Sequence, residues 1–121
     1  MSRKKTMPTA CLLLLLTGAA ACADSLGRDF AHCAGRYSAL TEHLWTVQAP
    51  AEEAAHRRDL FLDLVEATAP ADAALTWRVE AKAAQRALLE TATFATGPRA
   101  IRAHRDAFGA LDLCDRLLMG H

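Results

Sequence analysis

The chain has 121 residues, with 14 basic and 14 acidic side chains, 52% hydrophobic residues and four cysteines. This length allows one domain with a modest core. Arg3, Lys4 and Lys5 lie in a leader-like segment, and the chain that follows carries a net charge of about −3. Such a mild charge gives no electrostatic basis for binding nucleic acid or an anionic lipid surface, because both need concentrated positive charge.

The first 23 residues have the pattern of a secretory signal peptide. A short basic segment precedes an apolar core, ACLLLLL at residues 10–16, and the small residues AAACA follow at residues 19–23. The apolar run contains Pro8 and is near the lower length limit for a membrane span. We therefore expect a signal peptide at residues 1–23 and an exported domain at residues 24–121, periplasmic or secreted.

The processing site has two interpretations. Cleavage after Ala23 follows the small-x-small rule of signal peptides. Alternatively, Cys22 is a lipidation site of a membrane-anchored lipoprotein, although Ala19 stands where such signals usually have a leucine. Both routes leave Cys33 and Cys114 as an even pair in an oxidising compartment.

The spacing of apolar residues predicts four helices, and no segment has the alternation of a strand. The expected helices are residues 25–48, 51–68, 71–95 and 98–119, separated by Pro50, Pro70 and the Gly97-Pro98 pair. The connections are short, which favours antiparallel neighbours. The predicted fold is therefore all-α, a small antiparallel four-helix bundle.

Two cysteines provide a prediction about the topology of this bundle. Cys33 and Cys114 lie on the apolar faces of the first and last helices, about 12 Å and 9 Å from the same end of an up-down-up-down bundle. We expect a disulfide between them; two free buried cysteines are the alternative. Gly35, which is unfavourable inside a helix, indicates close approach of a neighbouring helix, unless the position is simply exposed.

The second and third predicted helices carry stripes of opposite charge. If these helices are neighbours, the stripes can flank a shared apolar seam and set its orientation. Otherwise both stripes face solvent, where ion pairs contribute little. The acidic helix has Glu52, His56, Asp59, Asp63 and Glu66, and the basic helix has Arg78, Lys82 and Arg86.

Candidate chemistry is sparse. Glu53 and His56 have the Glu-x-x-His spacing of one half of a di-metal site, but the second copy that such sites need is missing. His104 falls on the apolar face of the last helix, where a core or boundary residue is the simpler interpretation. Haem-attachment and serine-nucleophile motifs are absent from the sequence. We therefore expect neither an enzyme nor a cofactor.

Two residues are candidate contacts for a partner. Trp45 lies one step off the first apolar seam, and Arg36 flanks Cys33, whereas Trp77 is expected in the core. The sequence favours an exported, non-enzymatic interaction or accessory protein with a protein partner in the cell envelope. The alternatives are a lipoprotein tethered at Cys22, and a carrier of a small ligand or metal inside the bundle. No pattern indicates the oligomeric state.

Overall fold

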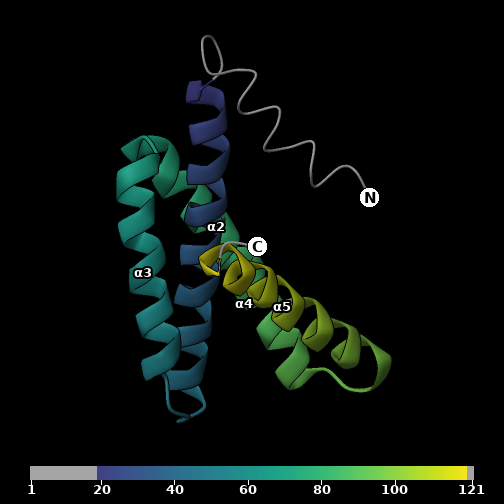
Figure 1. Cartoon of the computed structure of the whole chain (residues 1–121). Coiled ribbons are helices and arrows are strands. Elements are labelled where there is room, and N and C mark those ends of the chain that lie inside the picture. The colour runs from purple at the N-terminus through teal and green to yellow at the C-terminus, as the bar shows by residue number, and fades with distance from the viewer. Residues whose placement is uncertain (1–18, 120–121) are drawn as a thin grey trace.

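The computed structural model describes residues 19–119, with side chains from Ser25 onward. This part of the chain forms four helices and no strand: α2 (Ala19–Thr46), α3 (Glu52–Thr68), α4 (Ala71–Phe94) and α5 (Gly97–Leu118) (Figure 1). The all-helical prediction is confirmed. Most boundaries lie within two residues of the expected ones.

The first helix differs most from its predicted range. α2 begins at Ala19 rather than at residue 25, and residues 19–23 are mostly alanine, the residue with the highest helix propensity. At the other end, Gln48 adopts a left-handed backbone conformation with φ of 59°. A helix cannot continue through that conformation, so α2 ends before residue 48.

α2 is the central helix of the fold. α3 returns along one side of α2, and α4 runs along another side in the same direction as α2 (Figure 1). α3 and α4 follow one another in the sequence but make almost no contact. This differs from the expectation that each consecutive pair of helices packs side by side.

Small residues explain why α4 packs against α2. A Cβ atom added to Gly35 would lie 2.3 Å from the carbonyl oxygen of Arg78 and 3.0 Å from the backbone nitrogen of Lys82. The two backbones are therefore nearly in contact, and the close approach inferred from this glycine is confirmed. Ala74 and Ala81 provide the matching small side chains on α4 and are buried.

The main core lies between α2 and α3. The ring of Phe61 is fully buried, with centroids 6.0 Å from Tyr37 and 6.2 Å from Phe30. A second, smaller core joins α2, α4 and α5 through buried Ala39, Leu89 and Ala107. The α4–α5 hairpin thus has its own apolar contacts.

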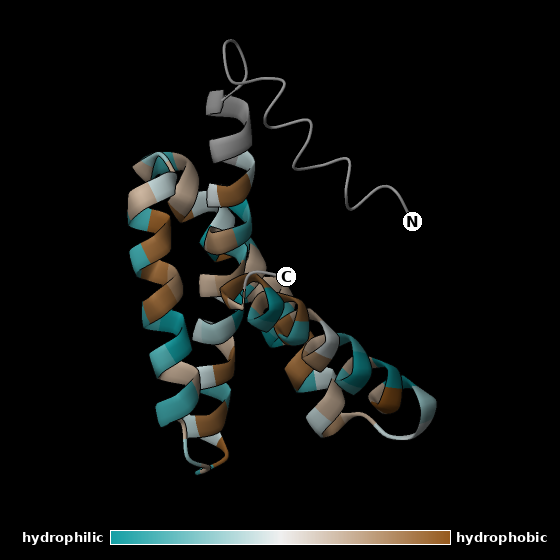
Figure 2. Cartoon of the chain, in the orientation of Figure 1, coloured by the Kyte–Doolittle hydropathy of each residue, from teal (hydrophilic) through white to brown (hydrophobic). Residues whose placement is uncertain are grey.

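α5 folds back on α4 and approaches α2 only with its C-terminal half (Figure 1). The side-chain amide of Gln85, which is 1% exposed, donates a hydrogen bond of 3.0 Å to the carbonyl of Ala107 and links α4 to α5. The rest of this hairpin diverges from α2 and α3, and hydrophobic positions recur along the divergent part (Figure 2). The bundle is therefore open on the side between α3 and α5.

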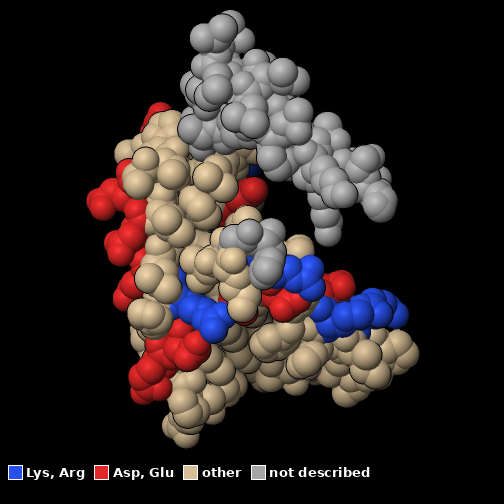
Figure 3. Space-filling model, in the orientation of Figure 1, with Lys and Arg blue, Asp and Glu red and all other residues tan. Residues whose placement is uncertain are grey.

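The two charged stripes do not meet. Lys82 and Arg86 of α4 both bind the carboxylate of Glu42 in α2, at 2.5 and 2.7 Å, and the hydrogen bond from Lys82 lowers the pKa of that carboxyl. The acidic side chains of α3 face outward instead, along one edge of the molecule (Figure 3). Packing of α4 on α2 rather than on α3 separates the stripes.

The helices were also compared with the length and hydropathy that a bilayer requires. Within residues 19–119, no helix is long and apolar enough to cross a membrane.

Candidate functional site in the groove between α2, α3 and α5

The opening between α3 and α5 forms a groove with a cavity volume of about 300 Å³, which we call the α5 groove. Its walls come from three helices and the loop before α3. The lining residues are Tyr37, Leu40, Leu44, Pro50, Glu53, Ala54, Arg57, Phe108, Leu111, Asp112 and Asp115.

The apolar part of the α5 wall is formed by Phe108 and Leu111, which differ in how far other helices cover them. Ala107, Leu111 and Cys114 are buried against α2 and α4. Ile101 and Phe108 lie on the flank of the helix that no other described element covers, and they are 69% and 41% exposed. The apolar face of α5 is therefore wider than the surface that α2 and α4 cover, and its remaining part is exposed.

His104 belongs to the exposed half of that seam. Its ring packs at a tilt against that of Phe108, with centroids 4.6 Å apart, and the residue is exposed. The interpretation of His104 as a core or boundary residue is wrong, because the open bundle leaves its side of α5 without a covering helix.

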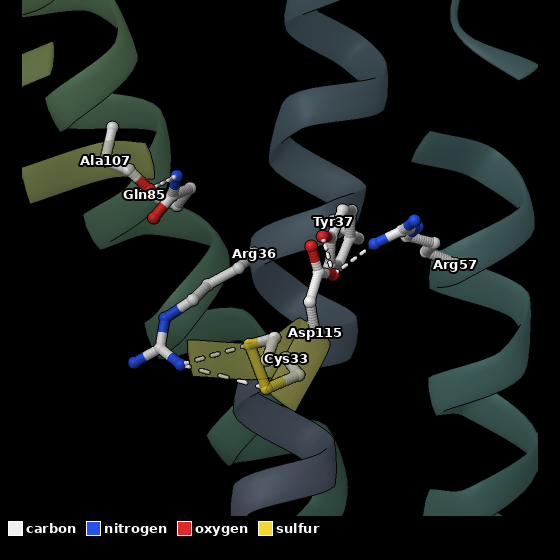
Figure 4. Close-up of a disulfide and its surroundings, with 8 residues drawn as sticks. Cys33, Arg36, Tyr37, Arg57, Gln85, Ala107 and Asp115 are labelled. Atoms are coloured by element: carbon white, nitrogen blue, oxygen red, sulfur yellow. Dashed lines mark hydrogen bonds and ion pairs between the residues drawn. A yellow bond between two sulfur atoms is a disulfide. The ribbon is translucent and has the colours of Figure 1, made fainter. Parts of the chain in front are cut away.

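A polar network is part of the lining of the α5 groove, and Figure 4 shows three of its side chains, those of Tyr37, Arg57 and Asp115. The hydroxyl of Tyr37 donates a hydrogen bond of 2.5 Å to Asp115, whose carboxylate also pairs with Arg57. Arg57 donates a second bond, of 2.9 Å, to Glu53. Residues from α2, α3 and α5 meet in this network. It therefore fixes the position of the C-terminal end of α5 relative to α2 and α3.

The position of Tyr37 in this network also raises the pKa of its hydroxyl group. Burial is the main reason that the pKa of Tyr37 lies well above its usual value of 10.0, and the hydrogen bond to Asp115 adds to the effect. Among the described residues, every buried side-chain nitrogen and oxygen has a hydrogen-bond partner. The network leaves no unpaired buried group that would call for a ligand.

The raised pKa of Tyr37 makes alkaline stability testable. Because the folded state holds the phenol neutral, the stabilisation from this group is complete below the unfolded-state pKa of about 10 and is lost as pH rises toward the folded-state value. Tyr37 is the only tyrosine in the chain, so phenolate absorbance in the near ultraviolet reports it alone. We expect phenolate to form only well above pH 10, together with loss of helical circular dichroism.

The control for this titration is Asp115→Asn, which removes the carboxylate that helps to raise the pKa. Phenolate should then form at lower pH than in the natural protein. Phenolate formation near pH 10 in a natural chain that is still helical would contradict the prediction.

Cys33 and Cys114 lie at disulfide distance, with sulfur atoms 2.10 Å apart and Cα atoms 5.6 Å apart. The predicted pairing of these positions is confirmed. The geometry differs from the one expected, because the end of α5 meets the middle of α2 rather than lying alongside its N-terminal part (Figure 1). Small side chains near the crossing point permit the short separation.

Arg36 lies at this crosslink. Its Nη1 atom is 3.6 Å from the sulfur of Cys114 and 4.0 Å from that of Cys33 (Figure 4). Trp45, the other candidate contact, is 59% exposed near the C-terminal end of α2. Trp77 is partly buried against the core, with the guanidinium of Arg28 5.1 Å from its ring centroid.

The remaining predicted sites are not assembled into a centre. Glu53 is engaged by Arg57, and His56 is exposed. Within residues 19–119, no group of three or more His, Cys, Asp or Glu side chains is placed to hold a metal ion. The side chain of Cys22 and most of the signal peptide predicted at residues 1–23 lie outside the described residues.

A second cleft of about 260 Å³ lies between the C-terminal parts of α2 and α4. Its lining mixes charged and polar side chains such as Glu42, His43 and Arg86 with the apolar side chains of Val47, Leu89 and Phe94, and Phe94 is 74% exposed. His43, one of the lining residues, has its Nε2 atom 3.4 Å from the hydroxyl of Thr93 in α4. The α5 groove has the more apolar lining, because its walls include Leu40, Leu44, Phe108 and Leu111.

Sequence reasoning missed the α5 groove and its polar network. One signal was available: Tyr37 falls on the apolar seam, and a buried tyrosine hydroxyl usually finds a partner. The identity of that partner, Asp115, depends on how α5 returns to α2, which no local pattern encodes.

We compared the chain with protein-family models, with curated proteins and with solved structures, and none of the three comparisons produced a match.

Proposed function

We propose that this chain is an exported, non-enzymatic interaction protein that binds a partner protein of the cell envelope through the α5 groove. The observation that carries the proposal is the exposure of Phe108, which is 41% exposed and lines the α5 groove opposite Leu40 and Leu44 of α2. Ile101, which is 69% exposed, lies two helical turns from Phe108 on the same face of α5 and extends this apolar surface beyond the groove. Contiguous apolar surface with a polar rim is typical of protein-binding sites.

Export is supported by the sequence pattern of residues 1–23 and by the cysteine pair. A signal peptide removed after Ala23 would leave residues 24–121 as the mature domain. A crosslink between Cys33 and Cys114 suits an oxidising compartment such as a periplasm. Lipidation at Cys22 is the alternative, and it would hold the same domain at the membrane.

A protein partner fits the α5 groove better than a small ligand does. Its volume is at the lower end of the range for ligand pockets, about 300–1,000 Å³. The polar side chains of Tyr37, Arg57 and Asp115 in its lining already bond to one another. A carrier of a small ligand is therefore the second candidate, favoured only by the placement of Tyr37, Arg57 and Asp115 beside an apolar wall.

The test is site-specific photocrosslinking in intact cells. A photoreactive amino acid at position 108 should form an adduct with one envelope protein, identified by mass spectrometry. The matched control is position 79 on α4, where Val79 is 57% exposed but does not line either cleft. Adducts at position 108 should disappear when Ile101→Asp is added in the same chain.

Two results would contradict the proposal that the α5 groove binds a partner protein. One is equal crosslinking from positions 108 and 79, and the other is an adduct at position 108 that survives Ile101→Asp. The intact mass of the recovered chain tests export in the same cells. A chain starting at Asp24 supports cleavage, a diacylated chain starting at Cys22 supports the lipoprotein, and an unprocessed cytoplasmic chain contradicts both.

A further inference from the structure

The side chain of Arg36 is directed at the crosslink between Cys33 and Cys114. Its Nη1 lies 3.6 Å from the Cys114 sulfur and 4.0 Å from the Cys33 sulfur, as Figure 4 shows. A disulfide is neutral and its sulfur atoms accept hydrogen bonds only weakly. The position of this guanidinium therefore does little for the oxidised pair.

Arg36 also lacks a close carboxylate. It is partly buried, and burial is the main reason that its pKa is lowered, while the nearest acidic influence comes from Asp29. None of the ion pairs of the described residues includes Arg36. A partly desolvated cation without an anion is unfavourable, and an anion formed at the sulfur would relieve this cost.

We propose that Cys33 and Cys114 are a thiol–disulfide exchange site, in which Arg36 stabilises the thiolate of Cys114 when a dithiol protein reduces the bond. Arg36 is closer to Cys114 than to Cys33, so Cys114 is the better leaving group.

The exchange balances as two successive displacements. A thiolate of the partner attacks the sulfur of Cys33, a mixed disulfide forms, and the electron pair of the broken bond remains on Cys114. The second thiol of the partner loses its proton to solvent and attacks the mixed disulfide, so that Cys33 leaves as a thiolate and takes up a proton. The partner dithiol becomes a disulfide, and the two electrons reside in the reduced pair Cys33 and Cys114.

Access to the bond requires movement of the end of α5, because both cysteines are buried. The last turns of α5 touch α2 and α3 through the crosslink and through the Asp115 network, while the rest of the helix packs on α4. Reduction would therefore loosen the part of α5 that borders the groove.

The first experiment measures the equilibrium between the folded chain and a dithiothreitol redox buffer at about pH 9. Arg36→Gln should shift this equilibrium toward the disulfide by about tenfold, the factor that corresponds to one unit of thiol pKa. Arg36→Lys keeps the charge and should stay closer to the natural protein. An Arg36→Gln variant that is reduced as readily as the natural chain overturns the proposal.

The second experiment follows the ionisation of Cys114 in a Cys33→Ser background, by the rate of alkylation against pH. The thiol should ionise below the usual value of about 8.5, and the addition of Arg36→Gln should raise its pKa, as expected for a thiol in apolar surroundings. The other charged or titratable groups near the site are present in both chains: Asp29, His32 and Arg28 on α2, Asp115 on α5 and Glu80 on α4. Burial and then Arg36 lower the pKa of His32, so Arg36→Gln raises that pKa toward its usual value of 6.5, and the alkylation rates are compared above pH 7, where this imidazole is neutral in both chains.

Circular dichroism of the reduced chain accompanies both measurements. If Cys114 titrates near 8.5 or higher while Arg36 is present, the proposal is wrong, whether the reduced chain is folded or not. Neither experiment depends on the protein that occupies the α5 groove, so their failure would leave the proposed binding function standing.

Discussion

Loss of the crosslink through Cys33→Ala with Cys114→Ala is expected to lower the free energy of unfolding by about 4–5 kcal/mol. The two residues are 81 positions apart in the sequence, so the bond closes a loop that includes most of the described chain. On the chain-entropy model a loop of this length restricts the unfolded ensemble by about that amount. Small domains have a total stability of about 5–15 kcal/mol, so the variant should be only marginally folded.

The measurement is urea unfolding monitored by circular dichroism, with the reduced natural chain as the control. Reduction removes the covalent link but retains the sulfur atoms in the core, whereas the double alanine variant removes both. The two should lose similar stability, with a slightly larger loss for the alanine variant because of its smaller buried side chains. A loss below about 1 kcal/mol in both would show that the crosslink is not what holds α5 to α2.

Gly35→Ala is expected to destabilise the fold by about 2–3 kcal/mol, although alanine is normally the better helix residue. The added methyl group would lie 2.3 Å from the carbonyl oxygen of Arg78, and backbone atoms of a packed helix cannot move aside cheaply. α4 would have to shift away from α2, and the cost of overpacking of this kind is about 1–3 kcal/mol.

Gly109→Ala is the matched control for this prediction. Gly109 lies inside α5, and nothing lies within 4 Å of the position that a Cβ would occupy. The same substitution should therefore stabilise the chain by about 0.5–1 kcal/mol, through helix propensity alone. Thermal unfolding of both variants tests the pair, and a stabilising effect of Gly35→Ala would show that α2 and α4 are not in close contact.

The sequence predicted local structure well, because helix formation depends on neighbours in the chain. Pro50, Pro70 and Gly97-Pro98 marked the connections, and apolar residues three and four apart marked the helices between them. Gly35 indicated close helix packing for the same reason, since a glycine inside a helix has a local cost that packing must offset.

The candidate site could not be predicted in this way. The apolar face of α5 was identified from the sequence. The spacing of its residues does not show which of them another helix covers. Ala107 and Leu111 became buried, while Ile101 and Phe108 remained exposed. The partners of Tyr37 and Glu42 are 78 and 40 positions away in the sequence, and such contacts depend on helix arrangement rather than on local spacing.

The sequence by itself determined four helical segments, their approximate ends and the pairing of Cys33 with Cys114. Only the tertiary structure decided that α4 packs on α2 and leaves α3 to one side. The physical reason is that α2 presents two different faces: small residues such as Gly35 toward α4, and aromatic residues such as Tyr37 toward α3. The apolar spacing of α2 includes Tyr37 but not Gly35, and only packing showed that the two neighbours of α2 make almost no contact with each other, which leaves the α5 groove open.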